Sequence, residues 1–539
     1  MIAVLAEEGQ YPAVKEFFEL FKTPWEFFHR NSRCSVLLCA AKQIPENSAK
    51  IVLVYEAQQN SFDRALGVQI RSRHSGAMVL LEENRIPIYG DCLTFGANEA
   101  GVLMHESSRE PVVVTIASDR RTIVRIGFDL FKEIEYLLTH GQPPAHSAIP
   151  TLDLHVALLR RLILGHSISL VEIPPVPDGH SFIACLTHDM DHIGIRNHKF
   201  DHTVFGFLYR ATLGSVLDVC CGKKNWRQMT INWFAVLKLP LIYLDLAADF
   251  WVQPDRYREI EKELNSTFFV IPKKGEPGLD LKGNRPPRRA ASYDAAKYMD
   301  LIKKLQFGGN EIGLHGIDAW RDSTAGGEEQ ETICRLTGAT ETGVRMHWLF
   351  FSEKSPALLE AAGFSYDSTV GYNQTIGYRA GTTQVYKPMT ATKLLELPLH
   401  VMDTALFYPN YMNLTPDEAQ EAVRPLIENA TRFGGVLTVN WHDRSVAPER
   451  LWDMSYAQLL EQVRIGGACF LTANRTVSWF RKRRAVVFEQ DGDIVKIKIP
   501  GDKETHLPGL RMRQYHPDAK GGKYSDAPLT DGSKIHLDA

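Results

Sequence analysis

The sequence predicts an α/β protein built around a parallel β-sheet, and two patterns support this. Between residues 266 and 472, short apolar runs alternate with helical segments at the spacing of βα units, which is typical of parallel sheets. Several of these runs are followed directly by acidic residues or histidines. Because the carboxyl ends of parallel strands lie at one edge of a sheet, we expect these side chains to gather in one site.

Length and charge limit the kind of protein this is. A chain of 539 residues is too long for a single core, so two to four domains are expected. The formal charge of −3, from 61 basic and 64 acidic side chains, gives no indication of a nucleic-acid partner. The oligomeric state is not predicted.

Cysteine usage and the amino terminus favour a cytoplasmic location. The eight cysteines form no Cys-x-x-Cys pair and no dense framework, which indicates reduced thiols. The first residues lack a basic leader, and their apolar run is shorter than that of a signal peptide. The most apolar later stretch, 231–252, is interrupted by Lys238, Pro240, Asp245 and Asp249, so we expect core or amphipathic helices there and no membrane span.

The first expected domain, residues 1–170, is a small α/β domain. It contains no phosphate loop and no dinucleotide fingerprint, and the sequence does not indicate its function. Helices are expected at 13–21, 128–138 and 152–164, and strands at 34–40, 51–55 and 111–117.

The second expected domain, residues 178–482, contains the alternating pattern. After its first strand comes a long aromatic and apolar excursion to about residue 254, interpreted as a lid or substrate-side wall, or equally as extra packing helices. Later strands are expected at 266–271, 311–314, 344–347, near Phe364 and Leu395, and at 436–441 and 469–472. Helices are expected at 293–305, 328–336, 355–362, 416–433 and 456–465.

The third expected domain, residues 485–539, is a small C-terminal β module. Two runs of alternating apolar residues, 486–489 and 494–499, flank Asp491-Gly492. This pattern predicts a β-hairpin with a type I′ turn.

The candidate site starts at the first strand of the second domain. An apolar run from Phe182 leads into Thr-His-Asp-Met-Asp-His at 187–192. Asp189 and Asp191 are two apart on extended backbone, so both carboxylates can face one side, with His188 and His192 beside them. Paired carboxylates with imidazoles are suited to a divalent metal and a general base. The alternative is that these residues cap a following helix.

This motif is the first of five that resemble, in order, those of the polysaccharide deacetylase superfamily, in the carbohydrate-esterase-type branch with Asp-x-Asp. The others are Glu-Ile-Gly-Leu-His-Gly at 311–316, Val-Arg-Met-His at 344–347, Glu-Leu-Pro-Leu-His-Val-Met-Asp at 396–403 and Gly-Val-Leu-Thr-Val-Asn-Trp-His at 435–442. The resemblance covers residues 178–480. It implies a distorted (β/α) barrel with fewer than eight complete units.

The resemblance also implies residue roles. Asp189 corresponds to the general base and Asp191 to a metal ligand, and Arg345 corresponds to the arginine that pairs with the base. His442 corresponds to the general acid, and Asp403 to the acid that fixes its tautomer.

The metal ligands depart from the family pattern at one position. His315 corresponds to the first histidine of the family's His-x-x-x-His motif, but Ala319 stands where the second belongs. His347 and Asp318 are the two candidates for the third ligand. We favour His347 because its strand-end position is suitable and neutral imidazole suits zinc; cobalt and nickel are alternatives for the single divalent ion.

The resemblance implies removal of an N-acetyl group from a sugar or glycan intermediate, as in surface-polysaccharide biosynthesis. The partner would then be a carbohydrate, or a small amide if the enzyme hydrolyses a different amide or imide C–N bond. A third hypothesis, supported by the absent motif histidine, is an inactive barrel that binds a glycan or a protein. Arg379, on a glycine-rich turn, is a candidate substrate anchor or a surface ion-pair residue.

Overall fold

The computed structural model describes residues 1–539 apart from 31, 33, 97–101, 119–120, 263, 492–493, 501–505, 518–521 and 537–539. The chain forms two compact units. Unit 1 consists of Met1–Gly179, Tyr378–Met389 and Ser478–Ala539, and unit 2 consists of His180–Gly377 and Thr390–Val477. The predicted third domain therefore falls within unit 1.

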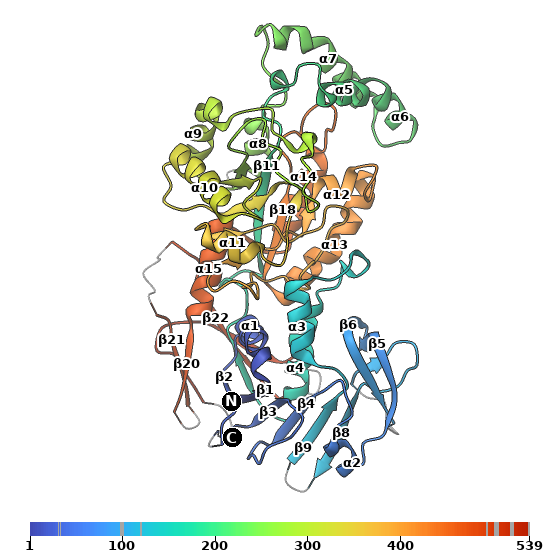
Figure 1. Ribbon diagram of the computed structural model, residues 1–539, viewed down its shortest axis with the longest axis vertical. Helices are drawn as coiled ribbons and strands as arrows, with labels where there is room; N and C mark the ends of the chain where they lie inside the picture. The colour runs from blue at the N-terminus through green and yellow to red at the C-terminus, as the bar shows by residue number, and fades with distance from the viewer. Residues whose placement is uncertain are drawn as a thin grey trace. The chain divides into compact units, whose positions relative to one another are not determined.

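Unit 2 is a distorted (β/α) barrel, as the sequence predicted (Figure 1). Its described strands form one parallel sheet in the order β16-β15-β14-β13-β12-β11-β18-β17, and β19 also pairs with β11. The strands are β11 (Phe182–Met190), β12 (Thr267–Val270), β13 (Glu311–Gly316), β14 (Val344–Met346), β15 (Tyr366–Asp367), β16 (Leu395–Glu396), β17 (Val401–Met402), β18 (Val436–Asn440) and β19 (Ala468–Phe470).

Strand β11 lies in the middle of this sheet and carries the first site motif. All nine of its residues are buried, which explains why it reads as a continuous apolar run. On one side it pairs with β18, and on the other it pairs first with β19 and then, from Thr187 to Met190, with β12. Its carboxyl end is thereby fixed between two neighbouring strand ends.

The barrel is closed by the chain itself and not by pairing of its edge strands. The edge strands β16 and β17 have two residues each and follow one another closely in sequence. Between them, Leu397 donates its backbone N–H to Asp367 in β15 (2.8 Å), and His400 donates to Thr438 in β18 (3.1 Å). The segment 397–400 therefore links the two edges of the sheet and gives the barrel its distorted form.

The five helices predicted for unit 2 after β12 are present with shifts of a few residues at their ends, whereas α8 and α12 were not predicted. The seven helices are α8 (Pro254–Glu261), α9 (Met299–Phe307), α10 (Ser323–Thr337), α11 (Ser355–Ala361), α12 (Asp403–Phe407), α13 (Pro416–Phe433) and α14 (Asp453–Ile465). Helix α13 shows why the helix bounds can be predicted from the sequence. Thr415 caps its start in a capping box with Glu418, and Gly434 ends it. Through α15 (Ala473–Ala485) the chain passes from unit 2 into unit 1.

The excursion after β11 forms a helical hairpin, defined here as residues 202–244. Helix α5 (His202–Tyr209), the π-helical turn η4 (Arg210–Gly214) and α6 (Ser215–Cys220) make one arm, and α7 (Trp226–Tyr243) makes the other. One face of the hairpin packs in a small core with Trp251 and Ala447. The arm His202–Cys220 is long and apolar enough to cross a membrane by length and composition alone, with 28% of it buried.

Unit 1 is built on a six-stranded sheet in the order β2-β1-β3-β4-β9-β8, parallel except for the β8–β9 pair. The predicted strands and helices are observed as β3, β4, β8, α1, α3 and α4. Strands β1, β2 and β9 and the long antiparallel pair β5–β6 were not predicted. The bounds are β1 (Ile2–Ala6), β2 (Trp25–Phe27), β3 (Val36–Ala40), β4 (Ile51–Tyr55), β5 (Ile70–Leu81), β6 (Asn84–Phe95), β7 (Met104–His105), β8 (Val113–Ser118), β9 (Arg121–Ile126), α1 (Tyr11–Phe21), α2 (Ser61–Ala65), α3 (Leu130–Thr139) and α4 (Thr151–Leu164).

The C-terminal part of unit 1 contains the predicted hairpin. Strands β20 (Val487–Asp491) and β21 (Ile494–Lys498) pair antiparallel, while part of the predicted type I′ turn, at 492–493, lies outside the described residues. Strand β24 (Lys534–His536) extends this sheet. Strands β22 (Arg511–Tyr515) and β23 (Tyr524–Pro528) form a second small sheet with β10 (Leu170–Glu172).

Candidate metal and catalytic site

A cavity of about 450 Å³ in unit 2 collects the side chains that the sequence singled out. Asp189, Asp191, His315, His347 and His442 all line it. A larger cavity of about 1100 Å³ in unit 1 is lined by residues such as Trp25, Glu26 and Cys34. We place the site in the smaller cavity, since the described residues hold three closely spaced metal-ligating side chains there.

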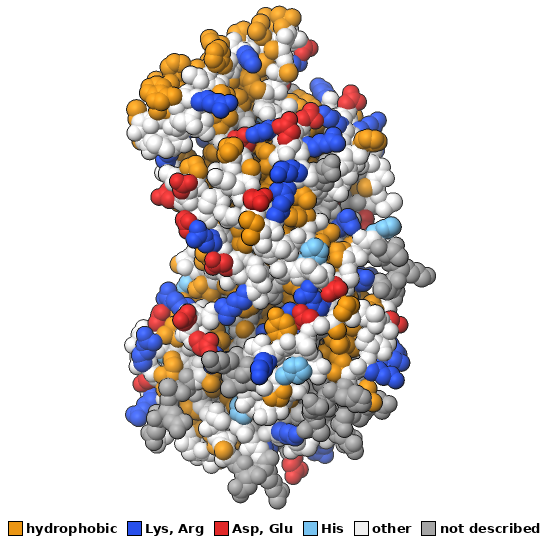
Figure 2. Space-filling view, turned by 180° about the vertical axis from the view of Figure 1, so that it is seen from behind, with side chains coloured by type: hydrophobic (Ala, Val, Ile, Leu, Met, Phe, Trp, Pro, Cys, Tyr) orange, Lys and Arg blue, Asp and Glu red, His pale blue; other side chains and the backbone are white. Residues whose placement is uncertain are grey.

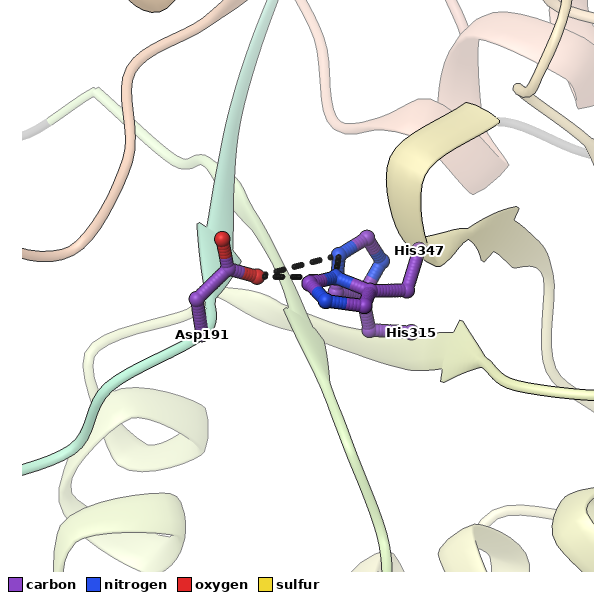
Figure 3. Close-up of side chains that lie close together, drawn as sticks. All are labelled: Asp191, His315 and His347. Atoms are coloured by element: carbon purple, nitrogen blue, oxygen red, sulfur yellow. Dashed lines mark hydrogen bonds and ion pairs between the residues drawn. The ribbon is translucent and has the colours of Figure 1, made fainter. Parts of the chain in front are cut away.

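Three ligand atoms converge in this cavity from three strand ends (Figure 3). Asp191 follows β11, His315 lies in β13, and His347 follows β14. Asp191 Oδ1 lies 3.2 Å from His315 Nε2 and 3.2 Å from His347 Nδ1, and the two nitrogens are 3.0 Å apart. Donor atoms about 2 Å from a tetrahedral zinc ion are separated by about 3.3 Å, so the spacing suits one ion bound by all three.

The chemistry of these groups also fits a metal ion. Asp191 Oδ1 is buried and has no hydrogen-bond partner, which is costly for a carboxylate unless a cation binds it. His315 Nδ1 lies 2.9 Å from the Arg345 carbonyl oxygen, so Nδ1 carries the proton and the Nε2 lone pair faces Asp191. Burial lowers the pKa of His347, which favours the neutral imidazole that a metal requires.

Asp189 is held by hydrogen bonds to both of its oxygens. Arg345 Nη1 donates to Oδ1 (3.1 Å), and Asn440 Nδ2 donates to Oδ2 (2.8 Å). Arg345 is itself fully buried and is fixed by Thr187 and Ser368. Burial would raise the pKa of Asp189, but His315, Arg345 and His442 lower it below its ordinary value. Asp189 is therefore ionised at neutral pH and can accept a proton.

His442, just after the end of β18, also lines the cavity. Its Nδ1 lies 2.6 Å from Asp403 Oδ1, and its backbone N–H donates to Asp403 Oδ2 (2.8 Å), so Nε2 is left to face the cavity, 3.8 Å from Asp191 Oδ2. Burial would lower the pKa of His442, but Asp403, Asp191 and Asp189 together raise it to about 10. His442 is therefore positioned and protonated as a general acid.

Two candidates from the sequence lie elsewhere. Asp318 accepts hydrogen bonds from Leu279 N and Arg321 Nε and is not part of the three-ligand group. Arg379 belongs to unit 1, where its carbonyl oxygen accepts the Gln142 N–H (2.7 Å), and it is not among the described residues that line the cavity. Of the two candidates for the third ligand, the structure thus brings His347 and not Asp318 into the three-ligand group.

The histidines next to Asp189 and Asp191 have different surroundings. His188 is fully buried, with Nδ1 2.7 Å from the Trp441 carbonyl oxygen and Nε2 2.8 Å from Glu261. These contacts tie β11 to its neighbours and leave neither ring nitrogen for a metal ion. Because side chains alternate along an extended strand, His188 points to the face opposite to that of Asp189. His192 follows the end of β11, lines the cavity and contacts His198.

Several site residues were missed by sequence reasoning. Asn440 holds Asp189, Ser445 donates to Asp403, and Arg444, Arg450 and Tyr408 line the cavity. Asn440 and Arg444 stand two residues on either side of His442. The polar residues at 440–445 are the sequence signal: had this whole stretch been considered, and not His442 alone, Asn440, Arg444 and Ser445 would have been candidates.

Comparisons with known proteins give matches among solved structures only. No family model and no curated protein matches the chain. A putative polysaccharide deacetylase from Mycobacterium smegmatis matches with 18% identity over 57% of this chain and 94% of that one, with a TM-score of 0.35. A probable polysaccharide deacetylase from Pseudomonas aeruginosa PAO1 matches with 12% identity over 57% and 95%, with a TM-score of 0.34. A 4-alpha-glucanotransferase from Thermococcus litoralis matches with 13% identity over 55% and 40%, with a TM-score of 0.28.

Proposed function

We propose that this protein is a metal-dependent hydrolase that removes the N-acetyl group from a sugar or glycan intermediate. The observation that carries the proposal is the content of one cavity: three convergent ligand atoms together with an ionised carboxylate, Asp189, and a protonated imidazole, His442. Base, metal ligands and acid are the parts that amide hydrolysis requires. Zinc is the preferred ion, with cobalt or nickel as alternatives.

Each residue has a defined task in this reaction. A divalent ion bound by Asp191, His315 and His347 would polarise the amide carbonyl and make a bound water more acidic. Asp189 accepts the proton of the attacking water, and Arg345 and Asn440 keep its carboxylate oriented. His442 donates a proton from Nε2 to the departing amine, which is too basic to leave unprotonated. The products are acetate and a free amino sugar.

The size and lining of the cavity support a small part of a glycan as substrate. A volume of about 450 Å³ accommodates a sugar unit, and Trp348, Tyr408 and Tyr411 offer aromatic faces. The same aromatic lining also favours a second candidate, hydrolysis of another small amide or imide. Release of acetate from N-acetyl sugars, measured against ammonia or acid release from small amides and imides, separates the two. A role in surface-polysaccharide biosynthesis and a cytoplasmic location stay predictions.

Metal content tests the ligand assignment. We expect the purified protein to hold about one ion per chain, and His347→Ala to lose it, because two ligands alone bind zinc weakly. Asp318→Ala is the matched control and should keep both the ion and the activity, since Asp318 lies outside the three-ligand group. Elemental analysis after loading with zinc, cobalt or nickel measures the result. If the wild-type protein binds none of these ions, the proposed mechanism is wrong. If Asp318→Ala loses the ion and His347→Ala keeps it, Asp318 is the third ligand in place of His347.

A further inference from the structure

The site cavity is also lined by three arginines that take no direct part in the proposed reaction, although Arg450 is linked to Asp403 through Ser445. Arg210 lies in η4, and Arg444 and Arg450 lie in the loop after β18. An N-acetyl group and a neutral sugar give no reason to place three guanidinium groups beside the reacting centre. Their surroundings show whether they serve the fold or a ligand.

Arg444 lacks partners although it is buried. It is 7% exposed, its Nε and Nη1 are buried without a hydrogen-bond partner, and no described carboxylate lies within ion-pair distance of its guanidinium group. The group stacks on the Trp251 ring at 4.9 Å, which fixes its plane but satisfies none of its N–H donors. Arg210 Nε is likewise buried and unpartnered. Buried guanidinium groups left unsatisfied destabilise a fold unless a ligand completes them.

The three arginines reinforce one positive field. Burial lowers the pKa of Arg210 to about 10, and the charges of Arg444 and Arg450 act in the same direction against the attraction of Glu449. Glu449 Oε2 accepts the Trp251 indole N–H (3.2 Å), and Asp443 accepts from the backbone N–H groups of His192 and Arg444. Burial would lower the pKa of Arg450, but the charges of Glu449, Asp403 and Asp443 act mainly on this arginine and raise its pKa, so Arg444 is left without an ion-pair partner among the described residues. Arg450 donates to Ser445 Oγ (3.1 Å) and to the Tyr408 hydroxyl.

We propose that Arg444, with Arg210 and Arg450, forms a subsite for a phosphate group carried by the substrate. Guanidinium groups match a phosphate with parallel N–H donors, and a tetrahedral dianion can satisfy donors from several arginines at once. The inference takes the N-acetyl sugar part of the substrate from the proposed function. The anion site itself is argued from the three arginines alone. The phosphate belongs either to a soluble sugar phosphate or to a sugar linked to a lipid phosphate.

Binding measurements with Arg444→Gln test the subsite. In the Asp189→Asn background, which prevents turnover, we expect N-acetylglucosamine 1-phosphate to bind about tenfold or more tightly than N-acetylglucosamine, because charged hydrogen bonds are involved. Arg444→Gln should reduce this preference to about twofold or less, and inorganic phosphate should raise Tm only when Arg444 is present. Arg258→Ala, which removes an exposed arginine outside the cavity, is the matched control.

The outcomes separate this inference from the proposed function. Equal binding of the two sugars, or a preference that survives in Arg444→Gln, overturns the subsite, as does a uronate that binds as tightly as the phosphate. A Tm of Arg444→Gln well below that of the wild type would also oppose it, since removing an unpaired buried cation should not destabilise the fold. If the protein prefers the phosphorylated sugar but the wild type releases no acetate, the phosphate subsite is supported and the proposed deacetylase activity is wrong.

A second, independent observation concerns the helical hairpin at 202–244. Figure 2 shows hydrophobic side chains gathered at the top of the view, over α5, α6 and α7. On α7, Trp226, Trp233, Leu237 and Leu241 follow one another at helical spacing and are 71%, 45%, 71% and 46% exposed, and Leu244, directly after the helix, is 68% exposed. The opposite face of α7 packs in the small core of the hairpin. An exposed apolar face of this extent on a folded protein marks an interaction surface.

We infer that this face lies on an anionic lipid membrane. Residues 202–244 contain five basic side chains and one acidic side chain. Lys224 pairs with Asp218 (3.1 Å) and Arg210 lines the cavity, while Arg227 and Lys238 are exposed and Lys223 is half-exposed at the turn between the two arms. Tryptophan and lysine beside an apolar helix face are suited to the boundary between headgroups and acyl chains. His202, Thr203 and Arg210 of the hairpin also line the site cavity. A membrane under the hairpin would therefore bring lipid-linked phosphates to the arginine subsite.

Vesicle sedimentation tests the membrane surface. We expect the protein to bind phosphatidylcholine vesicles that contain phosphatidylglycerol, and to bind pure phosphatidylcholine less well. The triple variant Trp233→Ser, Phe234→Ser, Leu237→Ser should bind at least about tenfold more weakly. Phe307→Ser is the matched control, because Phe307 is a 97% exposed side chain outside the hairpin. A lipid-independent dimer that the triple variant dissociates, or vesicle binding unchanged by it, would overturn the inference. Polyprenyl-phosphate-linked N-acetylglucosamine in the same vesicles, compared with the soluble 1-phosphate, then identifies the source of the phosphate.

Discussion

Replacing Asp189 with asparagine should lower kcat for acetate release by about 10³-fold while the protein keeps its metal ion. An amide cannot accept the proton of the attacking water. Asp191, His315 and His347 remain in place, so metal binding has no reason to fail. Steady-state kinetics and elemental analysis of the same preparation measure the two quantities together.

The fold of this variant needs its own control. The introduced amide has one acceptor oxygen, which can serve only one of the two donors, Arg345 and Asn440, and the buried Arg345 loses its counter-charge. A lowered Tm is therefore expected, and activity must be compared well below it. If the variant loses its metal ion, Asp189 is a ligand and the assigned roles are wrong. If it retains activity, another group is the base.

Replacing Asp403 with asparagine should lower kcat by about 10²-fold or more and move the alkaline limb of the pH–rate profile downwards. The acid must be protonated, so activity falls as pH rises through the pKa of His442, which is about 10 in the wild type. Among the charges that raise this pKa, Asp403 is the largest. Loss of one charged hydrogen bond should lower it by about one to two units, which places the limb near pH 8 to 9.

The same shift predicts a stability effect with a definite sign. The pKa of His442 is raised from its ordinary 6.5, so its interaction stabilises the folded state fully below about pH 6.5 and the contribution disappears as pH rises through 10. Asp403→Asn should therefore be most destabilising at acid and neutral pH. An alkaline limb that is the same in both proteins would show that His442 is not the acid. Thermal unfolding at several pH values checks the stability effect independently.

Elements with strong local signals could be predicted. Strands β11, β12, β13 and β18 read as buried apolar runs, and α13 shows its capping box and its terminal glycine in the sequence. The residues after these strands gather in one cavity because parallel strands end at one edge, so Asp189, Asp191, His315 and His442 were within reach of sequence reasoning.

Other features could not be predicted because the chain lacks local signals for them. The long pair β5–β6 is connected by Glu82 and Glu83 without glycine or asparagine, although Glu82 has a φ of 55°. Much of β5 is half-exposed and polar, which hides the strand periodicity. The contacts of Asn440 with Asp189 and of Arg450 with Tyr408 join residues far apart in the chain, so the sequence marks the stretch after β18 but not the partners of its residues.

The composition of unit 1 has a consequence for the order in which the protein folds during synthesis. Strand β10 needs β22, made more than three hundred residues later, and the buried Asp153 needs Thr382 and Thr383 as hydrogen-bond donors. The barrel, by contrast, consists of residues that have all been synthesised by Val477. Since unit 1 needs residues made after Val477, unit 2 should mature before unit 1. A ribosome stalled far enough beyond residue 477 to release the barrel should therefore present a protease-resistant barrel beside a still cleavable N-terminal region.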